Sequence, residues 1–370
     1  MKEFLLYAGH CAPIISALVC VVLLALHKSV RDTPYRTLNA YFLTVAFLWF
    51  CNIVYIYLPV LYTVINVLYY LGLFLGQVFF YRFVYSLTRL PGEKPFPRIH
   101  YIVPAVIVGV FAGWSLFVPF DVQLGIVTSR GEFAPGYEAY SRLFTARLVL
   151  RGVWNIFYTA LAWWRLMRYR LSVPDFSADV DRSSLRWVSV LLILSFSLVP
   201  PSLLAATFPR QELITSLLLL IPQLLLVAQH AIVCYNMAVG NFVQVKDTEE
   251  VPVVPTPPEQ ETLITLERKR RRFERYMRDH KPYLDPGLRI TDLVEAFHTN
   301  RSYLSGFINR VYGVNFSCYI NRLRMQEFES LRRRSGGTIP EEELASQAGF
   351  ENYQRYLRVK KISSNSFSSY

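Results

Sequence analysis

Hydrophobic residues dominate the chain up to about residue 240, and polar, mainly basic residues dominate it beyond about residue 260. In the first part, apolar runs of about 20 residues recur, the length that a helix needs to cross a hydrocarbon core of about 30 Å. There are seven such runs, at 7–27, 38–58, 60–87, 99–118, 143–166, 185–208 and 213–237. The pattern therefore predicts a membrane domain of seven spanning helices over residues 1–240.

The loops between these runs alternate in charge. Basic side chains follow the first, third and fifth runs, at Lys28, Arg31 and Arg36, at Arg89, Lys94 and Arg98, and at Arg168, Arg170, Arg182 and Arg186. The loops in between are poor in basic residues, with none near residue 59, Arg130 in the long loop 119–141, and Arg210 just past the sixth run. Because basic loops stay on the cytoplasmic side, we expect a multi-pass protein of a bacterial inner membrane with its N-terminus outside and its C-terminus in the cytoplasm.

Two arginines inside the fifth run are the most costly polar residues of the membrane domain, at about 2.5–3.5 kcal/mol each near a helix centre. Arg147 and Arg151 are four residues apart and share a helix face, which Asn155 extends by another turn. In the expected orientation they lie in the outer half of the membrane, where an anionic ligand could bind Arg147, Arg151 and Asn155. The alternative is that Arg147 reaches the headgroups and a carbonyl or another helix satisfies Arg151.

Sequence motifs of catalysis are not found. The apolar runs contain almost no Asp or Glu, which argues against an ion-coupled transporter, and there is no HExxH, GxSxG or phosphate-binding glycine loop. The cysteines have no paired spacing and are interpreted as small apolar residues, at Cys11, Cys20, Cys51, Cys234 and Cys318. We expect neither an enzyme nor a metal or cofactor site.

A linker and a basic helix, over residues 241–282, follow the membrane domain. The stretch DTEEVPVVPTPPEQ holds four prolines, which favour an extended spacer. The next segment is strongly basic and amphipathic up to Lys281. This basic segment is compatible with three roles, namely contact with anionic lipid, contact with DNA phosphates and pairing with a second copy of the chain. From Glu259 to the end, 20 Lys and Arg stand against 14 Asp and Glu, a net charge of 20 − 14 = +6.

The last segment, 283–370, has the helix pattern of a repeated helix-turn-helix. Ile290–Phe297 is a short amphipathic helix, a break follows at His298, and a second helix begins at Arg301 and stops near Gly313. A longer helix follows over 316–332, and the pattern then repeats over 340–348 and 351–358. The residues expected in the core are Leu304, Phe307, Ile308, Leu344, Ala345 and Phe350.

Several segments of the tail are also similar in sequence to a known protein family. The tail resembles the AraC-type DNA-binding domain, in which a long helix joins two helix-turn-helix units, through YLDPGLRITDLVEAF, TNRSYLSGFINRVYGVNF, YINRLRMQEF and ELASQAGFENYQRY, over roughly 283–361. The resemblance implies that double-stranded DNA is the partner and that the two recognition helices enter successive major-groove segments. It places the DNA-binding positions on Arg301, Ser302, Ser305, Gly306, Tyr353, Gln354 and Arg358, with Arg301 beside phosphate.

The tail departs from the family pattern at three places. Phe328 stands where a small residue is usual, no aromatic residue precedes Lys361, and Asn365-Ser-Phe-Ser replaces the closing Gly-x-x-Pro. These departures predict a looser second helix-turn-helix unit.

The sequence thus predicts an all-α protein, with a seven-helix transmembrane bundle followed by a cytoplasmic double helix-turn-helix domain. The expected function is that of a membrane-tethered one-component transcription regulator, whose sequence-specific DNA binding is controlled by a signal sensed in the membrane. Its expected partners are double-stranded DNA, membrane lipids and an unidentified ligand, with an anion and a homodimer as open options. The alternative is a membrane transporter or scaffold whose basic tail binds lipid or protein.

Overall fold

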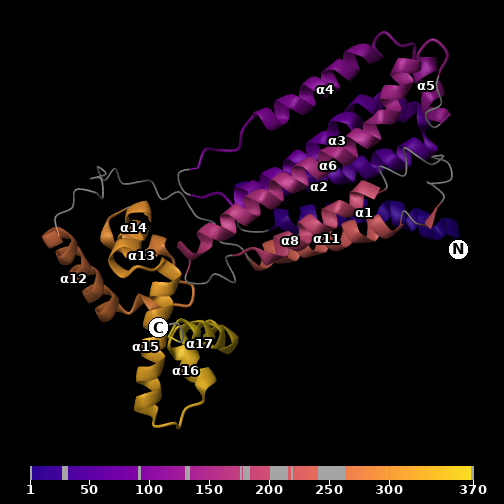
Figure 1. Ribbon diagram of the computed structural model, residues 1–370. Coiled ribbons are helices and arrows are strands. Elements are labelled where there is room, and N and C mark those ends of the chain that lie inside the picture. The colour runs from indigo at the N-terminus through magenta and orange to yellow at the C-terminus, as the bar shows by residue number, and fades with distance from the viewer. Residues whose placement is uncertain are drawn as a thin grey trace. The chain divides into compact units, whose positions relative to one another are not determined.

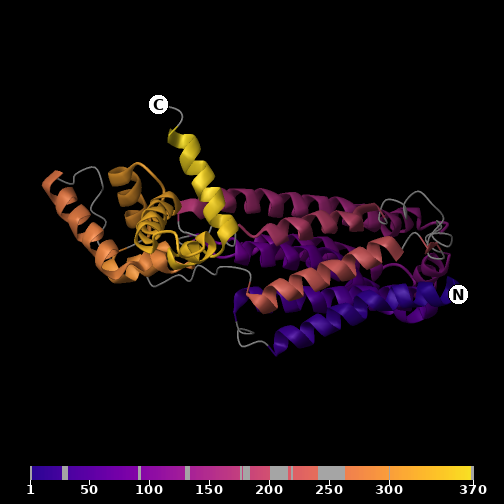
Figure 2. The ribbon, with the colours of Figure 1, turned by 90° about the horizontal axis from the view of Figure 1, so that it is seen from below.

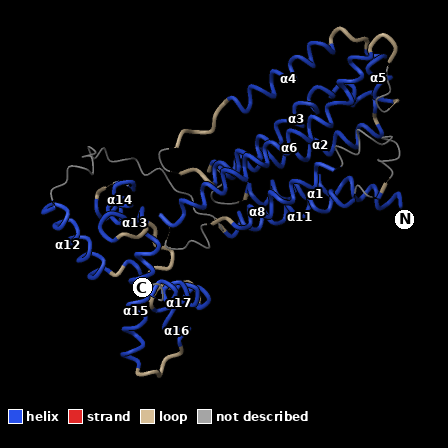
Figure 3. Tube along the Cα trace, in the orientation of Figure 1, coloured by secondary structure: helices blue, strands red, loops and turns tan. Residues whose placement is uncertain are grey.

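The computed structural model describes residues 2–26, 32–90, 93–129, 134–175, 177, 184–200, 216–217, 220–240, 263–299 and 301–367. Apart from an isolated bridge between Ser177 and Arg289, the described residues form helices and turns without a strand (Figures 1 and 3). The chain divides into two compact units, Met1–Arg168 with Leu185–Val245, and Tyr169–Ser184 with Lys246–Tyr370. The expected all-α class is therefore confirmed for the described residues.

The N-terminal unit is built from long apolar helices. Its elements are α1 (Lys2–Ala25), α2 (Thr33–Tyr57), α3 (Pro59–Leu87), α4 (Ile99–Ser115), α5 (Phe120–Thr128), α6 (Glu138–Ser172), α8 (Arg186–Ser195) with the short η2 (Phe196–Leu198), and α11 (Leu220–Val239). Helix α2 packs between α1 and α3, and α11 packs against α1 and α8 (Figures 1 and 2).

Four of these helices are long and apolar enough to cross a membrane, over Phe4–Ala25, Thr33–Tyr57, Pro59–Leu87 and Leu220–Val239. Helices α4 and α5, bent by 113° at a short break, make a fifth if they form one span. These helices indicate a membrane protein. Helix α6 holds the predicted run 143–166 but carries six arginines, at 142, 147, 151, 165, 168 and 170, which lower its hydropathy. The run 185–208 leaves the described residues after Pro200, so the count of seven stays a prediction.

Helices α1 and α11 lie unusually close together near the start of each. A Cβ added at Gly9 would lie 2.3 Å from Leu220 Cδ2 and 2.4 Å from Gln223 Oε1, so the missing side chain permits the approach. Beside it, the Gln223 amide and His10 Nδ1 form a hydrogen bond of 3.0 Å. Pro222 falls in the first turn of α11, where its missing N–H costs no helical hydrogen bond, so the helix continues through it.

The C-terminal unit contains two short helix pairs. Its elements are η1 (Val173–Asp175), α12 (Leu263–His280), η5 (Pro282–Leu284), α13 (Ile290–Phe297), α14 (Arg301–Tyr312), α15 (Phe316–Ser335), α16 (Glu341–Gln347) and α17 (Tyr353–Phe367). Helix α13 packs on α14, α16 packs on α17, and α15 contacts both pairs. The helices begin close to where the local pattern places them. Helix α17 starts two residues later than expected because Asn352 Oδ1 accepts the Arg355 N–H at 2.9 Å and caps the helix.

Each helix pair has its own aromatic core. In the first, the ring of Phe273 from α12 lies 5.4 Å from Phe297 and 5.5 Å from Phe307. The basic helix α12 therefore packs its apolar face into this unit and does not merely lie in solvent. The second core consists of Phe328, Leu344, Ala345, Ala348, Phe350 and Tyr356. All residues expected in the core are buried, and Phe328 fills the second core instead of loosening it, stacked on Tyr356 at 4.2 Å.

Candidate functional site

The first helix pair presents a small-residue surface at the start of α14. The turn before it closes at His298, which adopts a left-handed conformation with φ 49°. Ser305 is half-buried, and Gly306 is exposed with nothing within 4 Å of an added Cβ. Arg301 and Ser302 belong to α14, but their side chains lie outside the described part of the chain. Among the described positions this face therefore offers backbone and shape more than hydrogen-bonding side chains.

The second helix pair presents longer polar side chains. Gln354 and Arg358 are exposed on α17, and their spacing of four residues places them on one face. Tyr353 differs from them because its hydroxyl donates to Glu341 Oε2 at 2.9 Å, a hydrogen bond that raises the pKa of Tyr353. Tyr353 thus ties α17 to α16, whereas Gln354 and Arg358 are the residues placed to contact a ligand surface.

Basic side chains surround both helix pairs. The exposed ones on α12 are Arg268, Lys269, Arg270, Arg271, Arg272, Arg275 and Arg278, and Lys360 and Lys361 continue the charge on α17. Part of this charge is neutralised within α12, where Arg270 Nε lies 2.9 Å from Glu274 Oε1. The remaining excess of positive charge suits a polyanionic partner such as nucleic acid or an anionic lipid surface.

A buried arginine fixes α15 to the segment that precedes α13. Arg324 is fully buried, and its Nε donates to the Tyr283 carbonyl at 2.7 Å while Nη2 donates to the Asp285 carbonyl at 2.6 Å. The Tyr283 hydroxyl donates to Glu327 at 3.2 Å, and burial, with Glu327 next, raises the pKa of Tyr283 to about 12. Tyr283 therefore remains a neutral donor at physiological pH.

The second helix pair reaches the same segment. Gly349 has φ +88°, and a Cβ added there would lie 2.5 Å from the Tyr283 carbonyl oxygen. The turn between α16 and α17 is thus pressed against the segment that Arg324 holds. Sequence reasoning missed Arg324, although Ile320, Arg324 and Phe328 follow one another at helical spacing, and an arginine within such an apolar row is a signal for a buried role.

In the N-terminal unit, the Arg147 side chain is buried among the helices and does not extend to the surface of the bundle. It is 3% exposed, its Nη1 donates to Asn66 Oδ1, and its Nη2 donates to the Tyr62 hydroxyl at 2.7 Å. Its guanidinium carbon lies 3.7 Å from the centre of the Phe144 ring. Within the described residues its Nε has no hydrogen-bond partner and no carboxylate forms an ion pair with it. In the part of the chain that the structure describes, neutral and aromatic groups therefore surround this charge.

The two other predicted ligand residues continue along α6. Arg151 is half-buried, and Asn155 is buried with neither its amide nitrogen nor its oxygen hydrogen-bonded to a described residue. The three residues share a face of α6, and within the described residues Arg147 is the one of the three whose side chain is hydrogen-bonded to α3. A buried cation without a carboxylate, followed by an unsatisfied amide, is chemically suited to an anion or to a ligand with hydrogen-bonding groups.

Comparison with known proteins gives no match, either to a family model, to a curated protein or to a solved structure. The function must therefore be inferred from these residues and their arrangement.

Proposed function

We propose that this chain is a membrane-tethered, one-component transcription regulator that binds specific DNA sequences through its C-terminal unit. The observation that carries the proposal is the arrangement of two short helix pairs on the long helix α15, with exposed polar side chains on the second helix of the second pair. This order of helices supports the resemblance of the tail to the AraC-type DNA-binding domain. In that plan, α14 and α17 act as recognition helices.

The two helices would contribute differently to recognition. On α17, arginine and glutamine can each make bidentate contacts to base edges, worth about 1–3 kcal/mol of discrimination per contact. Arg358 and Gln354 are therefore the proposed base-reading residues. The face of α14 around Ser305 and Gly306 contributes close backbone approach and shape, while the basic residues of α12 provide phosphate contacts. We assign Arg301 and Ser302 to the same DNA-facing surface from the resemblance.

The apolar helices of the N-terminal unit hold the regulator in the membrane. We propose that the N-terminus lies outside and the C-terminus in the cytoplasm, because basic loops alternate with loops poor in basic residues. A ligand would act by binding one packing arrangement of the membrane helices better than another, so that the DNA-competent state changes in population. An anion at the face formed by Arg147, Arg151 and Asn155 is the proposed ligand class.

The test is a genome-wide footprint of the full-length protein in its membrane, compared with the double variant Gln354→Ala and Arg358→Ala. Discrete promoter peaks that the double variant loses are expected. In vitro, full-length protein in lipid nanodiscs should bind a peak sequence more tightly than random DNA. Arg358→Ala alone should reduce that preference by about 1–3 kcal/mol.

The matched control is Arg278→Ala, which removes the same charge from an exposed side chain of α12. It should leave the preference between specific and random DNA unchanged, whatever it does to total affinity and its salt dependence. Base reading by α17 is excluded if footprints are absent. It is also excluded if Arg358→Ala and Arg278→Ala each weaken binding to specific and random DNA equally. Binding to anionic vesicles that depends on the α12 arginines would then favour a scaffold.

A further inference from the structure

A hollow of about 470 Å³, a volume typical of small-molecule sites, lies between the last turns of α3 and the start of α4. It is lined by Arg82, Phe96, Arg98, Tyr101 and Ile102. Two of these residues are arginines, and among the described residues of the lining none is acidic. The hollow is therefore positively charged, although it lies among the apolar helices of the N-terminal unit.

Arg82 is fixed in place but keeps donors for a ligand. Its Nη1 donates to the Tyr101 hydroxyl at 2.8 Å, and its guanidinium carbon lies 5.9 Å from the centres of both the Phe96 and the Tyr101 rings. Its Nε is enclosed and has no hydrogen-bond partner among the described residues. Its Nη2 also has no partner there, and it is not enclosed, because Arg82 is only half-buried. An acceptor that enters the hollow can therefore reach this guanidinium.

Arg98 adds a second guanidinium at the mouth of the hollow. It directly precedes α4 and is exposed, and within the described part of the chain its side chain has neither an ion pair nor a hydrogen bond. Glu93, the one acidic residue of the sequence between Thr88 and Arg98, is ion-paired with Arg165 instead. The two arginines of the hollow thus suit an anion whose oxygens match the guanidinium fork, and phosphate is the group that does so.

The loop between α3 and α4 is packed against the bundle. The Tyr85 hydroxyl of α3 donates to the Lys94 carbonyl at 2.7 Å. The ring of Phe96 lies 5.4 Å from Tyr85 and 4.9 Å from His100, and His100 Nδ1 shares a hydrogen bond of 3.0 Å with the Tyr158 hydroxyl of α6. The walls of the hollow are therefore already in place, so that little ordering cost opposes binding.

An apolar row leads from the hollow along the outer face of α4. Ile102 lines the hollow, and Val106 and Val110 follow it at a spacing of four residues, with exposed fractions of 53%, 59% and 66%. Because α4 has the apolar composition of a membrane helix, this row is suited to contact with hydrocarbon chains. A free phosphate would leave the row uncovered, whereas a lipid would cover it while its phosphate occupies the hollow.

We propose that the hollow binds the phosphate of an anionic phospholipid, with an acyl chain along Ile102, Val106 and Val110 of α4. Arg82 and Arg98 bind the phosphate oxygens. A headgroup of net negative charge is favoured over a zwitterionic one, because a headgroup amine would meet two arginines and no free carboxylate. The site does not depend on DNA binding, and only its assignment to the cytoplasmic leaflet rests on the proposed orientation.

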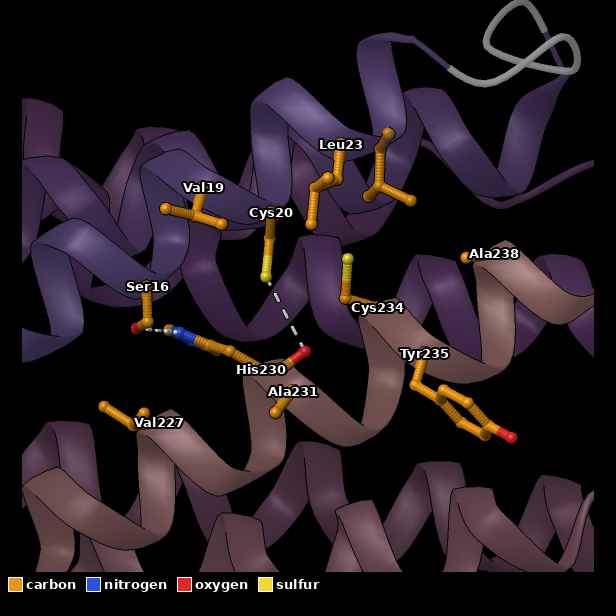
Figure 4. Close-up of a pocket in the computed structure, with 11 residues that line it drawn as sticks. Ser16, Val19, Cys20, Leu23, Val227, His230, Ala231, Cys234, Tyr235 and Ala238 are labelled. Atoms are coloured by element: carbon orange, nitrogen blue, oxygen red, sulfur yellow. Dashed lines mark hydrogen bonds between the residues drawn. The ribbon is translucent and has the colours of Figure 1, made fainter.

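The groove between α1 and α11 provides an internal comparison. Its lining is mostly apolar, and Figure 4 shows His230 directed toward Ser16, with which it shares a hydrogen bond of 2.8 Å. His230 is fully buried, so the described lining of this groove offers no accessible basic side chain. Lipid should therefore contact the groove without preference for the charge of its headgroup.

The test uses the full-length protein in phosphatidylcholine nanodiscs that carry a trace of a photoactivatable lipid. The probe is either phosphatidylglycerol or phosphatidylcholine, with the same diazirine-bearing acyl chain, and labelled peptides are identified by mass spectrometry. At about fivefold for each basic residue near the headgroup, the phosphatidylglycerol probe should label α4 about 25-fold more than the other probe. Both probes should label the groove between α1 and α11 equally.

Arg82→Gln and Arg98→Gln should each reduce the preference for phosphatidylglycerol at α4 about fivefold. The matched control is Arg168→Gln, which removes an exposed arginine of α6 one turn beyond Arg165, whose ion pair with Glu93 places it at the same end of the bundle. It should change the preference by less than about twofold. If Arg82→Gln fails to fold, Arg98→Gln decides, because the exposed Arg98 side chain supports no other residue.

Three results would overturn the proposal. Equal labelling of α4 by both probes would exclude a site for an anionic headgroup, and a preference that survives both arginine variants would exclude this hollow as its location. Millimolar inorganic phosphate or glycerol phosphate, compared with chloride at equal ionic strength, should leave the labelling unchanged. If either phosphate abolishes the preference, the hollow binds a soluble phosphate and the lipid assignment is wrong. None of these outcomes alters the DNA-binding test, whose variants lie on α17 and α12.

Discussion

The substitution Phe328→Ala tests whether the second helix pair depends on its aromatic core. Phe328 is fully buried and stacks on Tyr356, with the ring of Phe350 5.6 Å from Tyr356. Truncating a buried phenylalanine to alanine removes its transfer free energy and leaves a cavity, which together cost about 3–5 kcal/mol. The pattern of the AraC-type family places a small residue at this position. If that pattern governed this chain, alanine would be tolerated.

The measurement is hydrogen exchange by mass spectrometry on the full-length protein in nanodiscs. Peptides from α16 and α17 should lose protection by roughly 10²-fold or more, up to the limit set by the stability of this helix pair. Peptides from α13 and the membrane helices should keep their protection, because their cores do not include Phe328. The control Leu357→Ala, on the more exposed face of α17, should change protection less than about fivefold. If Phe328→Ala lowers the free energy of opening of this helix pair by less than about 1 kcal/mol, the cavity argument is refuted.

Two other predictions concern the glycines at positions 349 and 306 and the buried Arg147 of α6. Gly349→Ala should destabilise the second helix pair by about 2–5 kcal/mol in thermal unfolding, because φ is +88° and the new Cβ would meet backbone atoms. Gly306→Ala, in a helix with open space, should stabilise by up to about 1 kcal/mol, and equal effects for the two would contradict the argument. Arg147→Met should leave the protein folded. Removing a charge from the membrane interior is favourable by about 2.5–3.5 kcal/mol, which offsets the loss of the hydrogen bonds to Asn66 and Tyr62. Anions such as fatty-acid carboxylates should raise the melting temperature of the wild type but not of this variant. If the variant instead unfolds, Arg147 is required for the packing of α6 on α3 and its role is structural.

Local signals in the sequence predicted most of the helices. In the tail, the apolar rows, the break at His298 and the glycine at 313 are features of neighbouring residues, and the observed bounds of α13 and α14 follow them closely. In the membrane unit, the long apolar runs predicted α1, α2, α3 and α11 for the same reason. Helix α6 was harder to classify, because its arginines make it too polar by composition although it is long enough to span.

The amino-acid sequence by itself determined the all-helical class and the division into an apolar and a basic part, since helix periodicity and burial in lipid depend on residues a few positions apart. Only the tertiary structure decided which distant residues meet. It placed His10 beside Gln223, Arg147 beside Asn66 and Tyr62, and Phe273 of the basic helix in an aromatic core. Such contacts depend on how helices pack across tens to hundreds of residues, and no local pattern in one sequence records that packing.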